Sequence, residues 1–128
     1  MNVLVDTHAV IWFITDNSRL SPLARKVIES PENICFVSIA TFWEIGIKSS
    51  LGRLELSTTL EQIFEIIEDS GFQLLPISVN HVLKSSKLEF QHHDPFDRII
   101  IAQAQCEQVP LISKDEKIAN YDISLIWD

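Results

Sequence analysis

Four carboxylates stand out because each lies just after a short apolar segment or in the first turns of the helix that follows it. Asp6 follows VLV, Glu44 lies in TFWEIGIKSS, Asp97 in DPFDRIIIAQAQ and Asp115 in LISKDEK. Carboxylates brought together repel, by up to about 4 kcal/mol for a pair 4 Å apart in a partly screened site. Either some of them become protonated or a cation joins them. Their oxygen ligands suit one or two Mg²⁺ or Mn²⁺ ions, which could support metal-assisted hydrolysis of a phosphodiester.

Each acid also has a simpler structural interpretation. Asp6 could cap the helix that follows it, and Glu44 could pair with Lys48 four residues later. Asp97 could favour the dipole of its helix, and Asp115 could be a turn or cap residue. Taken singly, these interpretations are at least as good as a chemical role. Taken together they are weaker, because a carboxylate beside strongly apolar residues is costly unless it is paired or bound to metal.

The elements that must position these acids alternate between strands and helices. The predicted strands are residues 3–5, 34–38, 72–77, 109–113 and 123–127. The predicted helices are residues 7–14, 22–30, 39–51, from a cap at 58 or 59 to 71, 79–88 and 95–107, with a short helical turn after Asp115. This alternation predicts an α/β sandwich around a mostly parallel sheet, in one domain over residues 1–128. Ligands of such sheets bind beyond the carboxyl ends of the strands, where all four acids are expected.

The composition fits a globular protein but raises a question of charge. Apolar residues make up 46% of the 128, with 3 Gly and 5 Pro, and no apolar run approaches a membrane span. The first residues indicate a buried strand rather than a signal peptide. We expect Cys35 and Cys106 to be buried thiols of a reduced, cytoplasmic protein. The net charge of −8 counts against nucleic-acid binding unless metal ions supply the positive charge.

Several other polar and aromatic residues have expected positions. We expect contacts to a substrate backbone from Lys48, Arg53, Arg98, Lys114 and Lys117. We expect hydrogen bonds to the acids from Ser38 and Ser113. His92 and His93 are expected in a loop near the site, His81 on a helix surface, and Trp12, Trp43 and Phe96 in the core.

Four segments in series, NVLVDTHAVIWFI, VSIATFWEIGIKSSLGRL, HHDPFDRIIIAQAQ and LISKDEKI, resemble the PIN-domain family. More narrowly, they are similar to its VapC-type toxins of bacterial toxin–antitoxin pairs. The resemblance implies a three-layer α/β/α sandwich and an endoribonuclease that depends on Mg²⁺ or Mn²⁺. It places the catalytic, metal-binding acids at Asp6, Glu44, Asp97 and Asp115, and small hydroxyl residues at Thr7 and Ser113. It also implies a homodimer and a VapB-like antitoxin that inserts a segment into the active-site groove.

Several alternatives stand beside this interpretation. Asp94 offers a second acid near Asp97, although Asp94 followed by Pro95 fits a helix N-cap first. Relatives of this kind include RNA-processing nucleases that are not toxins, and a binding module for RNA or protein that has lost catalysis is a further possibility. A receiver domain or a haloacid-dehalogenase-type phosphatase fits poorly, because each needs paired acids around the first strand and only Asp6 is present there.

Overall fold

The computed structural model describes residues 1–54, 57–89 and 94–128. Its centre is a five-stranded sheet in the order β3-β2-β1-β4-β5, in which every neighbouring pair is parallel. The strands are β1 (Asn2–Val5), β2 (Ile34–Ser38), β3 (Gln73–Leu75), β4 (Leu111–Ile112) and β5 (Leu125–Ile126). The predicted parallel α/β fold is therefore confirmed.

Three strands are shorter than the sequence predicts, and proline explains two of them. Leu75 of β3 is followed by Pro76, and Leu111 of β4 is preceded by Pro110. Proline has no N–H to donate to a sheet ladder, so each strand is bounded on that side. The structure gives no comparable local reason for the shortness of β5.

Seven helical elements surround the sheet in the described residues. They are α1 (Thr7–Ile14), α2 (Pro22–Glu29), α3 (Ile39–Ser50), α4 (Leu60–Asp69), α5 (Val79–Lys87), α6 (Pro95–Glu107) and the 3₁₀ helix η1 (Glu116–Asn120). Side-chain caps fix their starts, as when Ser21 accepts a hydrogen bond from the Ala24 N–H at 3.0 Å and Thr59 from the Gln62 N–H at 3.2 Å. No helix in these ranges is long and apolar enough to cross a membrane.

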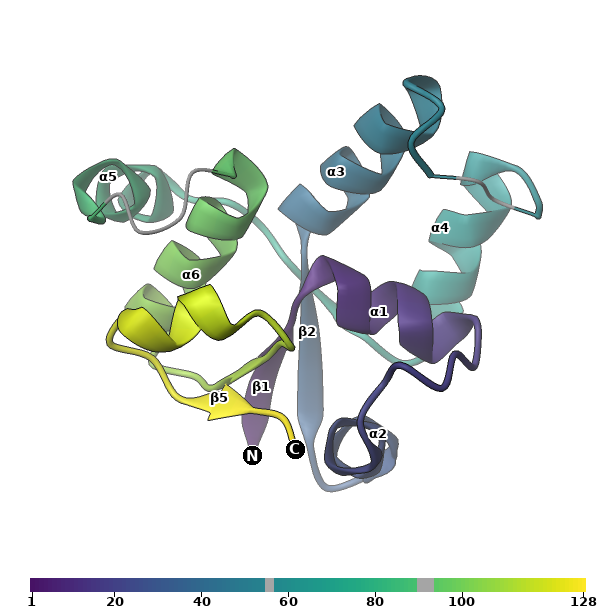
Figure 1. The fold of residues 1–128 in the computed structure, drawn as a ribbon, viewed down its shortest axis with the longest axis horizontal. Coiled ribbons are helices and arrows are strands. Elements are labelled where there is room, and N and C mark those ends of the chain that lie inside the picture. The colour runs from purple at the N-terminus through teal and green to yellow at the C-terminus, as the bar shows by residue number, and fades with distance from the viewer. Residues whose placement is uncertain (55–56, 90–93) are drawn as a thin grey trace.

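The helices form a layer on each face of the sheet. Side chains alternate between faces along a strand, so Val3 and Val5 of β1 point to one core and Leu4 to the other. The first core packs against α1, α2 and α4, and the second against α6 and η1, while α5 packs against α6. Figure 1 shows these groups on opposite sides of β1 and β2, with α3 above them. The result is the expected three-layer sandwich.

The two cysteines differ in burial. Cys35 is buried in β2, as expected, but Cys106 is exposed in the last turn of α6. The expectation of a buried Cys106 is wrong, because α6 turns Ile101 and Ala104 towards the core and Cys106 falls on the other side of the helix. Both cysteines are free thiols.

Candidate active site at the carboxyl edge of the sheet

Asp6 is fixed by the sheet and by the helix that it caps. Its backbone N–H donates to the carbonyl oxygen of Ile112 at 3.0 Å, which ties the end of β1 to the end of β4. Its Oδ1 accepts from the Ala9 N–H at 2.9 Å, so Asp6 is the N-cap of α1. The residue is only 7% exposed. Asp6 therefore has the predicted capping role. The cap also holds its carboxylate at the edge of the sheet, where a chemical role would need it.

The electrostatic surroundings of Asp6 link it to two other site residues. Burial raises the pKa of the Asp6 carboxyl. Hydrogen bonds from the Ser113 side chain and the Ala9 backbone, with the charge of His8, act to lower the pKa, while the negative charge of Glu44 raises it. The net direction is upward, because desolvation outweighs the favourable contacts. A nearby cation would favour the ionised form of this carboxyl.

Glu44 is the most deeply buried of the four acids. It lies in the second turn of α3 and is 1% exposed. Its Oε2 accepts from Lys48 Nζ at 2.5 Å, which is the i,i+4 pair expected on the simpler interpretation. Its Oε1 is buried and has no hydrogen-bond partner within the described ranges. A buried acceptor of this kind is costly, so one oxygen of Glu44 has capacity for a further ligand.

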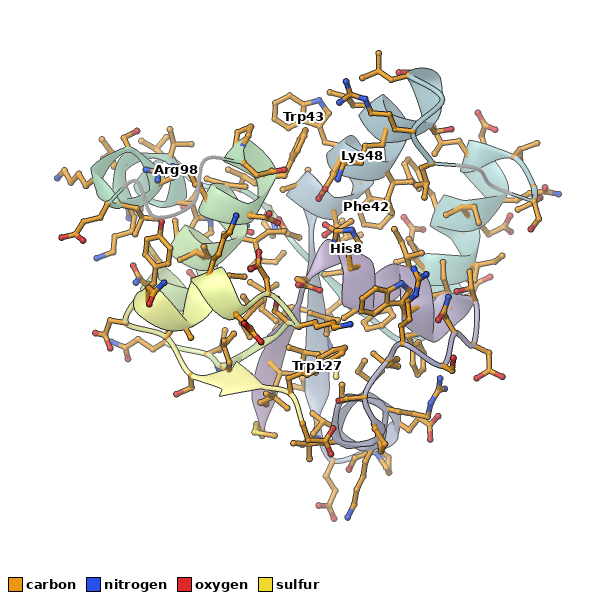
Figure 2. All side chains as sticks on the ribbon, viewed as in Figure 1. His8, Phe42, Trp43, Lys48, Arg98 and Trp127 are labelled. Atoms are coloured by element: carbon orange, nitrogen blue, oxygen red, sulfur yellow. The ribbon has the colours of Figure 1, made fainter. Side chains whose placement is uncertain are left out.

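The charges of two acids at the start of α6 also act on the Lys48 ammonium. Its burial alone would lower the pKa of the ammonium. The hydrogen bond and charge of Glu44, and then the charges of Asp94 and Asp97, raise that pKa overall. Lys48 therefore lies within the combined negative field of α3 and the first turn of α6. Figure 2 shows it on α3, on the side of the site.

Asp94 and Asp97 have different positions at the start of α6. Asp94 Oδ1 accepts from the N–H groups of Phe96 at 2.9 Å and Asp97 at 3.2 Å, so it is the N-cap that its position before Pro95 predicts. Asp97 lies in the first helical turn and is half-buried. The adjoining His92 and His93 lie outside the described residues.

Ser113 joins Asp6 to Asp115. Besides its hydrogen bond to the Asp6 carboxylate, the Ser113 hydroxyl accepts from the Asp115 N–H at 3.1 Å. Asp115 caps η1 through Oδ1, which accepts from the Lys117 N–H at 3.0 Å. Ser113 is fully buried beyond the end of β4, so it fixes the spacing of two acids.

The other predicted hydroxyl residues hold helices in place. Ser38 Oγ accepts from the Ala40 N–H at 3.0 Å and caps α3, and within the described residues it makes no hydrogen bond to an acid. The Thr7 and Thr41 hydroxyl oxygens lie 3.0 Å apart in a buried hydrogen bond between α1 and α3. Because α1 begins beside Asp6 and α3 carries Glu44, this contact sets the relation between those two acids.

Two adjoining hollows open at this edge. The first, here the Asp6 hollow, has a volume of about 930 Å³, and its lining includes Asp6, His8, Trp12, Ser113 and Asp115. The second, the Glu44 hollow, has a volume of about 290 Å³, and its lining includes Thr7, His8, Trp12, Glu44 and Lys48. His8 and Trp12 line both hollows, and their rings lie 5.8 Å apart between centroids. Asp6 and Asp115 thus line one hollow and Glu44 the other, on either side of the first turns of α1, whereas Asp97 lines neither of them.

The residues present fit a hard divalent cation, although they do not form a complete cage. Over residues 1–54, 57–89 and 94–128, no group of three or more His, Cys, Asp or Glu side chains lies together as a ligand set. Mg²⁺ is commonly held by only one or two carboxylates together with water and substrate phosphate. The free acceptor capacity of Glu44 Oε1 and the nearby Asp6 carboxyl meet that need. The joint role of all four acids as metal ligands stays a prediction.

Arg98 has a structural position that differs from the expected substrate contact. It is 7% exposed, and its guanidinium donates to the backbone carbonyls of Ser85 at 2.8 Å, Leu88 at 2.9 Å and Glu89 at 3.0 Å. These carbonyls belong to the carboxyl end of α5 and the residues after it. Arg98 therefore joins α5 to α6, and Figure 2 shows it directed towards α5. These contacts give Arg98 a structural role and turn its guanidinium away from the edge where a substrate contact was expected.

Trp43 and His81 lie in other positions than their expected ones. Trp43 is 60% exposed, and its ring meets the ring of Phe96 edge-on with 5.1 Å between centroids. The expectation that Trp43 is core is wrong, because α3 turns Thr41, Glu44 and Ile45 inwards and Trp43 to the other side. His81 is buried instead of lying on a helix surface. Its Nδ1 accepts from the Ser78 N–H, and its Nε2 lies 3.0 Å from Glu107 Oε2.

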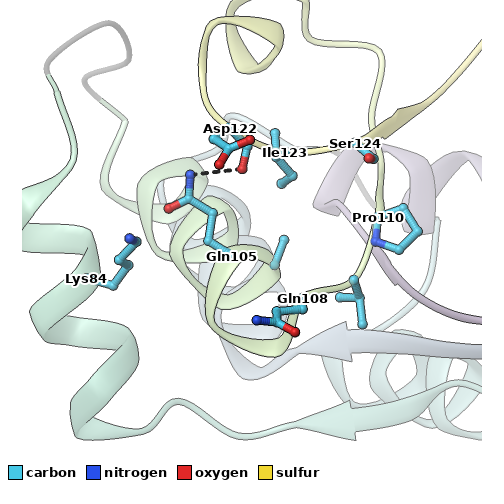
Figure 3. A pocket seen from close by; sticks show the side chains of 9 residues that line it. Lys84, Gln105, Gln108, Pro110, Asp122, Ile123 and Ser124 are labelled. Carbon is cyan, nitrogen blue, oxygen red and sulfur yellow. Dashed lines mark hydrogen bonds between the residues drawn. The ribbon is translucent and has the colours of Figure 1, made fainter.

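A separate cavity of about 490 Å³ lies at the other end of the sheet. Its lining includes Gln105, Gln108, Pro110, Asp122 and Ser124, from α6 and the segments before β4 and β5. Figure 3 shows this cavity, where Gln105 Nε2 donates to the Asp122 carbonyl at 3.3 Å. None of the four predicted acids lines it, so it is not part of the acidic edge.

The fold and the edge together define a parallel α/β domain with carboxylates beyond the ends of β1, β2 and β4. The PIN domain family matches residues 3–124, so the chain belongs to the PIN domain family. It is 27% identical to "Ribonuclease VapC22" of Mycobacterium tuberculosis over 123 residues, which covers 93% of this chain and 91% of the relative.

Solved structures share the fold. VapBC2 from Rickettsia felis, bound to a DNA fragment from their promoter, superposes with a TM-score of 0.73 at 15% identity over 100% of both chains. VapBC-5 from Mycobacterium tuberculosis, a member of the VapBC family of toxin-antitoxin systems, has a TM-score of 0.64 at 16% identity over 98% of this chain and 97% of the other. At these identities the likeness concerns the fold alone.

Proposed function

We propose that this PIN domain is an endoribonuclease dependent on Mg²⁺ or Mn²⁺. The observation that carries the proposal is the buried Glu44 carboxylate, with one oxygen lacking a partner in the described chain, in electrostatic contact with the buried Asp6. A divalent cation between the two buried carboxylates would offset the repulsion between their charges. The similarity to a curated ribonuclease supports RNA as the substrate.

Each site residue has a distinct part in the proposal. Asp6 and Glu44 would hold the ion, with Asp97 and Asp115 as flanking ligands, and Ser113 would orient Asp6. A bound divalent ion would supply positive charge for the scissile phosphate and make water a better nucleophile. The side chains themselves bind, orient and accept protons, so no covalent enzyme intermediate is required.

The proposal also accounts for the acidic charge of the chain. The formal net charge is −8, and phosphate binding normally depends on lysine and arginine. Lys114 lines the Asp6 hollow and Arg53 lines the Glu44 hollow, so positive charge flanks the acids locally. We infer that these two residues, with the exposed Lys117, contact the RNA backbone next to the cleaved bond.

We further propose that the enzyme is the toxin of a toxin–antitoxin pair, that it forms a homodimer and that a VapB-like antitoxin restrains it. The related VapBC structures support a protein partner. Apolar side chains exposed on α3 and α5 offer surface for such contacts, namely Trp43, Val79, Val82 and Leu83. Co-expression with its VapB-like partner should yield a complex and relieve growth arrest.

The test is cleavage of a panel of structured RNAs, tRNAs included, with Mg²⁺, with Mn²⁺ and with EDTA. Wild type would be compared with Glu44→Gln, which preserves the size of the side chain and removes its charge. The exposed Glu65→Gln on α4 is the matched control. We expect metal-dependent cleavage in wild type and control, and a loss of at least about a hundredfold in Glu44→Gln.

Two outcomes would favour the alternatives. RNA binding without cleavage under any metal condition would indicate a PIN-fold binding module. Metal-dependent cleavage without growth arrest on expression would indicate an RNA-processing nuclease that is not a toxin. Equal cleavage by wild type and Glu44→Gln would refute the proposed site.

A further inference from the structure

The position of Lys48 resembles that of a bound cation. Its ammonium lies 2.5 Å from Glu44 Oε2 and feels the charges of Asp94 and Asp97. It therefore interacts with acids of both α3 and α6, including two of the four predicted metal ligands. A divalent ion held by Glu44 would be attracted by the same negative charges that attract Lys48.

The pair differs from an ordinary ion pair on a helix surface. The Glu44 side chain is almost fully buried, and a buried carboxylate is costly without a partner. Lys48 supplies that partner to one oxygen only, because Oε1 has none within the described residues. The Lys48 side chain is 32% exposed and can leave towards solvent on its flexible stem. The ammonium can therefore be replaced without rearranging the core.

Among the described residues, the other positively charged side chains near Glu44 do not form this ion pair with it. Arg19, Arg53 and His8 line the Glu44 hollow, but the ion pair recorded for Glu44 in the described chain is with Lys48. Lys114 lies at the Asp6 hollow, with its ammonium 5.9 Å from the centroid of the Trp12 ring. Lys114 thus offers a comparison residue with the same charge at the same edge but a different contact.

We propose that Lys48 is a built-in counter-ion that competes with the divalent cation for Glu44. In the absence of metal, Lys48 neutralises the buried carboxylate and keeps the acidic edge folded. Because both cations draw on the single charge of Glu44, metal binding weakens the Lys48–Glu44 pair, so the pair sets the metal concentration at which the site fills. This inference rests on the proposed metal-dependent function.

The test is titration of the whole protein with Mn²⁺ by calorimetry, comparing wild type, Lys48→Met and Lys114→Met at low ionic strength. We expect Lys48→Met to bind Mn²⁺ about tenfold more tightly or better, which corresponds to about 1.4 kcal/mol. Lys114→Met should give a clearly smaller change, because it removes the same charge without freeing Glu44. In thermal unfolding, Lys48→Met should lose stability without metal and gain more than wild type when Mn²⁺ is added.

A charge-conserving variant covers the case in which Lys48→Met fails to fold. Lys48→Arg keeps the positive charge and can present two donors to the carboxylate. We expect it to bind Mn²⁺ more weakly than wild type. In a Glu44→Gln background, Lys48→Met should no longer tighten binding, since the group in competition is gone.

The outcomes separate this inference from the proposed function. If wild type binds Mn²⁺ and Lys48→Met binds it equally or more weakly, the counter-ion role is refuted and the metal site stands. Equal tightening in Lys114→Met would also refute it, because the effect would be general electrostatics. If neither wild type nor Lys48→Met binds Mn²⁺, both proposals fail.

Discussion

The backbone N–H of Asp6 donates to the carbonyl oxygen of Ile112 at 3.0 Å, where β1 and β4 end side by side. This bond places Asp6 next to Ser113, the residue after Ile112, and Ser113 in turn contacts Asp115. The parallel register of two strands thus fixes the first and last of the four acids. Their separation is decided by backbone geometry, which makes the predicted site a property of the fold.

Asp6 has both a capping and a chemical role, and two substitutions should separate them. Asn caps helices about as well as Asp does, so Asp6→Asn should keep α1 and abolish cleavage. Asp6→Ala should abolish cleavage and also lose about 0.5–2 kcal/mol of stability through the lost cap. Urea unfolding with EDTA measures the stabilities. Cleavage by Asp6→Asn at the wild-type rate would contradict the assignment.

The raised pKa of Asp6 predicts how stability depends on pH in the absence of metal. A carboxyl whose pKa is higher in the folded state favours folding most when it is protonated. Its contribution is complete below the ordinary value of 3.8 and is lost as pH rises through the raised folded value. Asp6→Asn has no such loss. The stability of Asp6→Asn minus that of wild type should therefore grow with pH in unfolding curves measured with EDTA, and a constant difference would argue against a raised pKa.

Arg98 should be a stability residue and not a substrate contact. The Arg98 guanidinium donates to the carbonyl oxygens of Ser85, Leu88 and Glu89. Removing it takes one hydrogen-bond donor away from each of them. We expect Arg98→Met to lose roughly 2–4 kcal/mol in urea unfolding. Arg98→Lys should recover only part of this, because one ammonium lacks the fork geometry of a guanidinium. Arg19→Met, at an exposed arginine, is the control. If Arg98→Met and Arg19→Met both lose equally little unfolding free energy, the assignment is wrong.

The hydrogen bond between Thr7 and Thr41 should couple α1 to α3. Thr41→Val removes one hydroxyl and leaves the other buried without this partner, at a cost of about 1–3 kcal/mol. The double variant Thr7→Val/Thr41→Val should cost less than the sum of the single variants, because no orphaned hydroxyl remains. Unfolding free energies of the four proteins measure the coupling. Strict additivity would show that the hydroxyls act independently.

The sequence predicted most of the fold because its local signals agree with its packing. Caps at Ser21, Thr59, Ser78 and Asp94 start helices where polar side chains precede periodic apolar residues. Apolar runs mark the strands of a sheet buried on both faces. The predicted ends of the strands were less accurate, because pairing with neighbouring strands decides where a strand ends. Pro76 and Pro110 are local signals that mark one end of β3 and of β4.

Trp43 and Cys106 were missed because their exposure depends on which face a helix turns inwards. The periodicity of Thr41, Glu44 and Ile45 could have placed Trp43 on the outer face of α3. Nothing local could have shown that Arg98 reaches the end of α5, because that contact joins two helices through tertiary packing. For the acids, topology predicted a shared edge. The separation of Asp6 and Asp115 from Glu44 into two hollows depends on the position of α1, which carries His8 and Trp12 between them.

The order of the strands also has a consequence for the timing of activity during synthesis. β1 lies inside the sheet between β2 and β4, but β4, Ser113 and Asp115 follow α6 in the chain. A nascent chain that has emerged only as far as α6 carries Asp6, Glu44 and Asp97 without the strand that fixes Asp6. The proposed site is therefore incomplete until β4 has joined the sheet beside β1.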